Sequence, residues 1–322
     1  MQNVISFDTT MPVFMGAKAL SSQKIAFDFS VPVSATSVQF DPPAQIDHIE
    51  EPGNRILVHL LAPLPEGERI MADLLVEDKK GNTLMIITPF RARNERIPKL
   101  VLNEIRTEYS KPKVEFIELV TKTTGNLGGL KVITAYQGLL QPLYEFPPIE
   151  VTAGECIVLH LRTVEEACLD ETTEDLSLSG ATETNNFSRD LWINGSEERL
   201  RKTDGIALVD QDGNLIDAVL FSEYTTGEWL KNELSQFCSL LNEKGAWKQK
   251  TGKDGPLLPQ DAMPSGTTTT TRTICRDEAT EDSDSALNWY VTVTSGATPG
   301  ASNRTERYSE AAKTMRATKK GK

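Results

Sequence analysis

Short segments of alternating apolar residues, separated by turn-forming residues about every 8 to 12 positions, fill the first part of the chain and constrain its fold most strongly. In residues 24–30, apolar Ile25, Phe27 and Phe29 alternate with smaller or polar side chains, and Pro32 ends the segment. Further strand-like segments follow at 54–61, 69–78 and 83–88. This spacing predicts a β-sandwich.

The length of 322 residues predicts two domains, because a domain usually has about 100 to 200 residues. Residues 94–99 form a short polar hinge with a proline, which is typical of a linker. We therefore expect domains at residues 1–96 and 97–304, followed by a basic, disordered tail at 305–322.

The first domain resembles the bacterial immunoglobulin-like domain of cell-surface proteins. Three motifs in the order found in that family carry the resemblance. They are Phe-Ser-Val-Pro-Val at 29–33, Pro-Leu-Pro-Glu-Gly at 63–67 and Asp-Lys-Lys-Gly-Asn at 78–82. The last motif also predicts a hairpin turn between two strands.

The second domain, residues 99–304, resembles the lamin-tail domain, an immunoglobulin-like β-sandwich of nuclear lamins and many secreted bacterial proteins. Ordered landmarks carry this resemblance: Asn-Glu-Ile at 103–105 with Glu-Phe-Ile-Glu-Leu at 115–119, an Ala-Gly-containing strand at 149–159, a Leu-x-Asp-x-x-Gly hairpin at 208–219, and Trp289 with Thr-Pro-Gly-x-x-Asn at 298–303. Residues 273–289 look similar to lamin-tail lipoproteins of spirochaete-type envelopes. This resemblance implies an exported, lipid-anchored protein at the cell surface or in the periplasm.

Two insertions distinguish the second domain from a minimal lamin-tail sandwich. Residues 163–190 are acidic and polar, which predicts a long loop or a partly helical excursion. Residues 224–272 begin with an amphipathic helix, entered through Thr225–Glu228 and ended by Gly245, and continue as a loop. The predicted fold class is all-β, two tandem immunoglobulin-like β-sandwiches, the second with an inserted amphipathic helix and long loops.

The net charge is −12 and is unevenly distributed: residues 99–303 carry −14, whereas residues 304–322 carry +5. An acidic body repels phosphate backbones, so nucleic acid is disfavoured as a partner of the folded domains. Only the basic tail leaves that possibility open.

The four cysteines, Cys156, Cys168, Cys238 and Cys275, match no zinc-binding spacing. Their even number allows two disulfides, with three possible pairings, in an oxidising compartment. Isolated small apolar residues are the equal alternative, favoured for Cys238 because it lies on the apolar stripe of the predicted helix. Since the sequence starts without a secretory signal pattern, the protein is either cytosolic or exported by a leader that is absent from this sequence.

The sequence contains no recognisable catalytic motif, which predicts that the protein is not an enzyme. Its three histidines, His48, His59 and His160, have no partner at motif spacing and are expected to be buried or strand-surface residues. Glu104, Glu115 and Glu118 are carboxylates on adjacent strands. We expect them to be framework residues, with Glu115 facing solvent and Glu118 facing the core.

The segment Asp210-Gln-Asp-Gly-Asn resembles the start of a calcium loop, with Asp210, Asp212, Asn214 and Asp217 as weak candidate ligands. However, Phe221 stands where an EF-hand would place its glutamate. A hairpin turn explains the same residues and is favoured. The sequence therefore predicts no cofactor and no metal, with calcium as the alternative.

These observations predict a noncatalytic cell-envelope protein that presents β-sandwich domains for scaffolding or for binding a protein or glycan of the envelope or host. Membrane contact is expected only through a lipid anchor outside this sequence. One alternative is an accessory module of, or a metal-dependent, extracellular hydrolase. Another is a nucleic-acid-associated scaffold that uses the basic tail.

Overall fold

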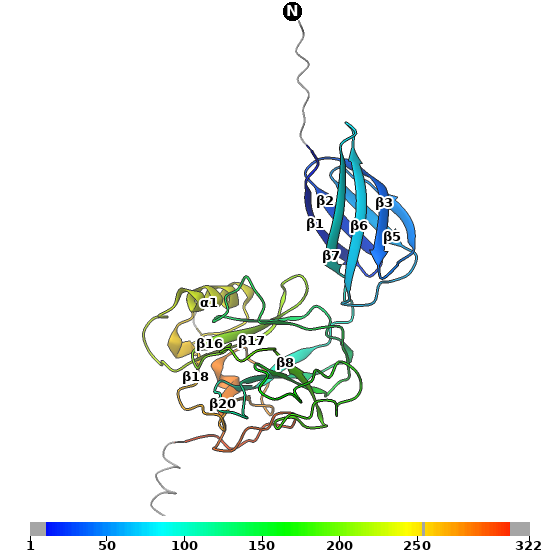
Figure 1. The fold of residues 1–322 in the computed structure, drawn as a ribbon. Helices are drawn as coiled ribbons and strands as arrows, with labels where there is room; N and C mark the ends of the chain where they lie inside the picture. Colours follow the sequence, from blue (N-terminus) through cyan, green and yellow to red (C-terminus); the bar gives the residue numbers. More distant parts are fainter. Residues whose placement is uncertain (1–10, 253–254, 310–322) are drawn as a thin grey trace, which may run out of the picture. The chain divides into compact units, whose positions relative to one another are not determined.

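A computed structural model describes residues 11–252 and 255–309, and it forms two compact units, Met1–Arg96 and Ile97–Lys322 (Figure 1). The polar hinge at 94–99 spans the point of division. The regular secondary structure of the described residues is nearly all β, as predicted. Within them, no helix is both long and apolar enough to cross a membrane.

The first unit consists of two antiparallel sheets, in the strand orders β1-β2-β5-β4 and β3-β6-β7. The strands are β1 (Phe14–Ser21), β2 (Lys24–Phe29), β3 (Val33–Asp41), β4 (Ile46–Glu50), β5 (Arg55–Leu60), β6 (Arg69–Asp78) and β7 (Thr83–Arg91). Alternate side chains of β6, from Ile70 to Val76, are buried. They pack with Phe27 and Val58 of the other sheet in one core, which makes this unit a β-sandwich.

An aspartate-led turn closes the hairpin between β6 and β7 in the first unit. Asp78 Oδ1 accepts hydrogen bonds from the backbone N–H groups of Lys80 (2.8 Å) and Asn82 (2.9 Å). Gly81 has a φ of 82°, in the left-handed region that favours glycine. The predicted hairpin at 78–82 is therefore present, and the aspartate side chain organises it.

The second unit contains a six-stranded sheet, β15-β14-β9-β8-β19-β20, a five-stranded sheet, β12-β11-β16-β17-β18, and the short pair β10-β13. Most pairs are antiparallel, whereas β14 with β15 and β17 with β18 are parallel. Side chains of both large sheets share one core, so this unit is also sandwich-like. The strands are β8 (Leu100–Arg106), β9 (Phe116–Thr121), β10 (Gly125–Asn126), β11 (Lys131–Thr134), β12 (Tyr144–Glu145), β13 (Glu150–Val151), β14 (Cys156–His160), β15 (Ser188–Trp192), β16 (Asp204–Val209), β17 (Leu215–Ser222), β18 (Met263–Pro264), β19 (Ile274–Arg276) and β20 (Trp289–Val291).

Helix α1 (Asn232–Lys244) is the one α-helix of the described residues, and two 3₁₀ turns, η1 (Pro259–Asp261) and η2 (Ala286–Asn288), follow it. The helix lies beside β16 (Figure 1). On its apolar face, the ring of Phe237 lies directly over Gly205 of that strand. The helix begins later than its predicted entry at Thr225–Glu228. Gly227 adopts a left-handed φ of 92°, which is incompatible with a continuous helix.

The basic tail was predicted to be disordered from residue 305, and this is wrong for its first residues. Arg307 forms an isolated β-bridge with Thr292, and the Tyr308 N–H donates to the carbonyl of Val291 (2.8 Å). The carboxylate of Asp277 also pairs with Arg307 at 2.5 Å. Residues 310–322, the rest of the predicted tail, lie outside the described residues.

Candidate functional site

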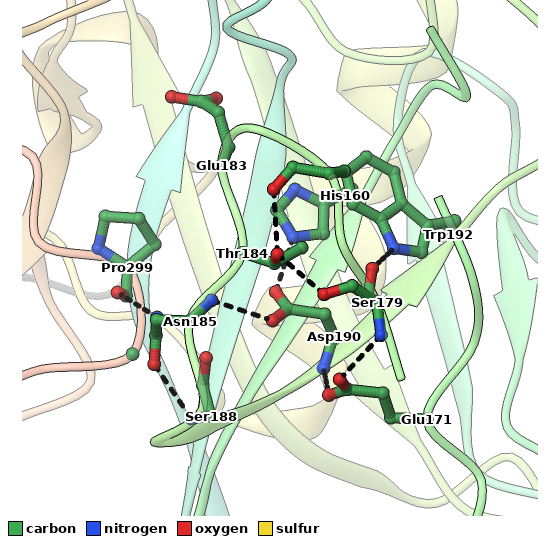
Figure 2. Close-up of polar contacts among 12 residues, drawn as sticks. His160, Glu171, Ser179, Glu183, Thr184, Asn185, Ser188, Asp190, Trp192 and Pro299 are labelled. Atoms are coloured by element: carbon green, nitrogen blue, oxygen red, sulfur yellow. Dashed lines mark hydrogen bonds and ion pairs between the residues drawn. The ribbon is translucent and has the colours of Figure 1, made fainter. Parts of the chain in front are cut away.

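The most elaborate polar arrangement of the second unit lies under the long loop that joins β14 to β15 (Figure 2). His160 ends β14 and is fully buried. Its Nε2 lies 2.6 Å from Oδ1 of Asp190 on the neighbouring strand. The indole of Trp192 stacks on the imidazole with ring centroids 3.9 Å apart. The prediction of a buried histidine is therefore confirmed for His160.

Glu171 attaches the middle of this loop to β15. Its carboxylate accepts hydrogen bonds from the N–H groups of Ser179 (3.1 Å) and Asp190 (2.8 Å), and its own N–H donates to the carbonyl of Asp190 (3.0 Å). Burial raises the pKa of the Glu171 carboxyl, and these backbone donors oppose that rise. Arg189 adds a hydrogen bond to the Glu171 carbonyl (2.6 Å).

Both ends of the loop have further attachments. Asp170 accepts the N–H of Trp192 (2.7 Å), while the Trp192 indole donates to Oγ of Ser179 (3.1 Å). Near the other end, Glu183 forms an ion pair with the buried guanidinium of Arg106. The segment predicted as a loop or partly helical excursion is thus a loop without a helix, held by buried charged and polar groups.

The outer surface of this loop carries exposed apolar side chains. Phe187 is 84% exposed, and Leu169 and Leu178 are 52% and 42% exposed. Beside the loop, a shallow pocket of about 310 Å³ is lined by polar residues that include Lys113 and Asn185. A fixed loop with exposed apolar groups is suited to binding, because little conformational entropy remains to be lost when a partner docks.

Glu104 and Glu118 face each other on β8 and β9, and both are fully buried. Thr273 and Thr298 donate to Glu104, whereas Asn103 (2.8 Å) and Gly300 N–H (2.6 Å) donate to Glu118. Burial, reinforced by the charge of Glu104, raises the pKa of Glu118 to about 8, and burial also raises that of Glu104. The core-side orientation expected for Glu118 is wrong: its neighbours Ile117 and Leu119 pack in the main core, so Glu118 faces the opposite side of the sheet, where Thr298 and Gly300 cover the pair. A β-bulge between Leu102 and Glu104 brings Glu104 opposite Glu118.

The expectation that Glu115 faces solvent is wrong, since its side chain is only 2% exposed. Arg162 binds both carboxylate oxygens, at 2.7 and 2.5 Å. The guanidinium also lies 4.4 Å from the centroid of the Tyr109 ring. Alternation did not predict this burial, because Glu115 lies just before β9 rather than within it and is covered by Arg162.

The calcium candidates have other partners. Asp210 repeats the turn of Asp78: Oδ1 accepts the N–H groups of Asp212 (2.8 Å) and Asn214 (2.9 Å), and Oδ2 accepts the amide of Asn214 (2.9 Å). Asp217 is buried in β17 and binds Arg276 (2.6 Å). The four residues therefore do not converge on one cation, and the hairpin turn explains the motif.

The hydrogen bonds of this turn allow us to predict how much stability the protein loses when the Asp210 side chain is removed. We expect Asp210→Ala to lower the free energy of unfolding by about 1–2 kcal/mol, because three hydrogen bonds are lost. Chemical denaturation should give the same loss in calcium chloride and in EDTA. The exposed Glu223 serves as the control, and Glu223→Ala should change stability by less than about 0.5 kcal/mol. A loss that appears only with calcium would restore the metal interpretation.

All four cysteines are free in the structure, which does not contain the disulfides that their even number allowed. Cys156 and Cys275 lie on β14 and β19, which β9 and β8 separate by about 14 Å, beyond the reach of a disulfide. Cys238 belongs to the main core, and Cys168 packs against a separate small cluster. Burial raises the pKa of the Cys156 and Cys238 thiols to about 12.

Sequence reasoning missed one group, in the first unit. The sequence showed no partner at motif spacing for any histidine, yet His48 and His59, which lie on strands as expected, face each other on β4 and β5. Together with Glu50, their potential ligand atoms all lie within 4.8 Å of one another. The signal was available, because positions 48 and 59 are equally distant from the turn at Gly53 and Asn54.

Comparison with known proteins places the second unit in a family. A family model described as "TP_1001_2nd: protein second domain" matches residues 98–291. An uncharacterised protein of Treponema pallidum (strain Nichols) is 27% identical over 191 residues, which are 56% of this chain and 48% of that protein. The chain thus spans about half the length of this relative.

Among solved structures, the N-terminal part of the bacterial S-layer protein SbsC is similar at a TM-score of 0.26 and 15% identity, over 46% of this chain and 40% of that chain. The family match is the stronger result, since it covers more than half of the chain. The protein therefore belongs, through its second unit, to the TP_1001_2nd family.

Proposed function

We propose that this protein is a noncatalytic envelope protein that binds a protein partner through the loop between β14 and β15. The observation that carries the proposal is the loop itself. Buried groups such as Glu171 fix it from below, while Phe187 is 84% exposed at its surface. A large aromatic side chain that is exposed on a fixed loop is typical of a surface that a binding partner covers.

A protein partner is favoured over a glycan by the distribution of aromatic residues. Glycan-binding surfaces commonly stack sugars on exposed tryptophan rings, yet Trp192, Trp247 and Trp289 are at most 7% exposed, and Trp229 is half-buried. Leu169 and Leu178, on the same loop as Phe187, instead add exposed apolar side chains of the kind that protein partners cover.

The remaining parts of the proposal rest on the sequence. The ordered landmarks of residues 99–304 support a lamin-tail-like second unit, and the motifs of residues 29–82 support an immunoglobulin-like first unit. Export to the periplasm or cell surface, with a lipid anchor, follows from the same resemblance. Against the hydrolase alternative, the carboxylates of Glu104 and Glu118 are buried and bound by hydrogen-bond donors, and Asp217 binds Arg276.

Site-specific photocrosslinking tests the proposal. We would place a benzophenone amino acid at position 187 and irradiate intact cells that naturally make the protein. The matched control carries it at position 140, because Leu140 is 98% exposed and apolar but lies outside the loop.

We expect a discrete, protease-sensitive crosslinked product from position 187 and none from position 140. Products of equal yield from both positions, or none from 187, 169 and 178, would count against the loop as the binding surface. A product that survives protease but is degraded by glycosidase would identify a glycan partner and reject the protein-partner proposal.

A further inference from the structure

We propose that His48, Glu50 and His59 form a binding site for a divalent transition-metal ion at the edge of the first sheet. His48 and Glu50 lie on the edge strand β4, and His59 lies opposite His48 on β5. Antiparallel pairing thus brings two imidazoles and a carboxylate to one place. Their rings stack with centroids 4.1 Å apart and planes 12° from parallel.

The separations of the ligand atoms suit a tetrahedral ion. Nε2 of His48 lies 3.6 Å from Oε1 of Glu50, and Nε2 of His59 lies 3.5 Å from Oε2. Zinc–ligand bonds of about 2.0–2.2 Å at tetrahedral angles require ligand atoms roughly 3.3–3.5 Å apart. Binding would require the two stacked rings to tilt toward each other, because each imidazole lone pair lies in its ring plane and the planes are only 12° from parallel.

The neighbouring hydrogen bonds leave the Nε2 atoms of His48 and His59 available to bind a metal ion. Nδ1 of His48 lies 2.8 Å from Oδ2 of Asp47, and a proton on Nδ1 in this hydrogen bond leaves the Nε2 lone pair of the neutral ring toward Glu50. Nε2 of His59 is buried and has no hydrogen-bond partner. A carboxylate that orients a histidine through its other nitrogen is the usual outer support of a metal-binding imidazole.

The chemistry of the group selects the class of ion. Imidazole nitrogens favour Zn²⁺, Cu²⁺ and Ni²⁺, whereas Ca²⁺ and Mg²⁺ prefer oxygen ligands. His48 and Glu50 are exposed, which leaves further coordination positions open to water or a second ligand. Lys24 pairs in register with His59 and its charge acts on Glu50, so a bound cation must compete with this ammonium group.

A zinc titration of the full chain, freed of metal by a chelator, tests this assignment by calorimetry and by NMR of the histidine ring protons. We expect one Zn²⁺ per chain and shifted signals for His48 and His59. The third histidine, His160, is an internal control, because it is buried against Asp190 and should not shift. Excess Ca²⁺ should not displace the zinc.

Matched variants identify the ligands. The double variant His48→Ala with His59→Ala should lose at least about 100-fold in zinc affinity, and Asp47→Asn should lose about 10-fold as an outer support. Glu68→Gln, at an exposed carboxylate of the same unit, should bind as the wild type does. Circular dichroism melting would establish that each variant is folded.

Two outcomes would overturn the proposal. One is wild-type zinc affinity in the folded double variant. The other is a wild-type chain whose His48 and His59 signals stay unmoved at about 1 mM Zn²⁺, far above the range of a built site.

Discussion

Replacing Arg276 by methionine should lower the free energy of unfolding of the second unit by about 3–5 kcal/mol, because it leaves buried Asp217 without its ion-pair partner. Both side chains are less than 10% exposed, and Nη2 of Arg276 lies 2.6 Å from Oδ2 of Asp217. Nε also donates to the carbonyl of Leu102 (2.7 Å). Methionine keeps much of the volume of the arginine stem, so the loss reports on the charge and the hydrogen bonds.

The pKa of Asp217 shows that the stability lost in Arg276→Met comes from burying an ionised carboxylate. Burial raises it to about 6, and the guanidinium of Arg276 opposes the rise. Without that guanidinium, the carboxyl should take up a proton at a still higher pH. The stability lost in Arg276→Met should therefore be partly regained as the pH falls toward 5, where the protonated side chain carries no charge.

Arg307 offers a matched control. It also pairs with an aspartate, Asp277 at 2.5 Å, and also lies over an aromatic ring, that of Tyr290, but its side chain is 56% exposed. Arg307→Met should cost less than about 1 kcal/mol. Urea denaturation followed by tryptophan fluorescence reports on the second unit alone, since Trp192 is the first of four tryptophans in the chain. If both variants lost the same free energy of unfolding, burial would not be what makes the Arg276–Asp217 pair important.

The second large effect is a pH dependence centred on Glu118. Its pKa rises from 4.5 in the unfolded chain to about 8 in the folded one, through burial first and the charge of Glu104 second. The folded state therefore holds a proton that the unfolded state releases. The contribution of Glu118 to the free energy of unfolding is greatest below about pH 4.5 and should fall as the pH rises to 8, by an amount on the order of a few kcal/mol.

The substitution Glu118→Gln isolates this contribution. Its amide mimics the neutral carboxyl, so the slope of stability against pH between 5 and 8 should flatten relative to wild type. Glu174→Gln changes an exposed carboxylate of the same unit and should preserve the slope. Urea titrations at four or more pH values measure all three proteins. A slope unchanged by Glu118→Gln would mean that Glu118 is ionised in the folded chain.

Local sequence signals were sufficient for the strands and the turns. Alternation in residues 24–30 predicted β2, and Asp78 with Gly81 predicted the hairpin, because these features depend on neighbours a few positions apart. The start of α1 was misplaced because a single left-handed glycine, Gly227, has more influence than the amphipathic pattern around it.

The polar sites were harder to predict because their partners are distant in sequence. Glu104 is bound by Thr298, and Asp217 accepts the N–H of Leu102. Neither contact has a local pattern, since it depends on which strands become neighbours in the sheets. The pair His48 and His59 was closer to prediction, because one hairpin register is enough to bring these residues together.

The parallel pairing of β14 with β15 also limits how the intervening segment can change. Two parallel neighbours need a connection of a dozen or more residues to return the chain to its starting edge, whereas a hairpin needs only two. Residues 161–187 are therefore a crossover connection that the parallel pairing requires, and they cannot be deleted without losing it. Shortening them to a tight turn would abolish β15 pairing.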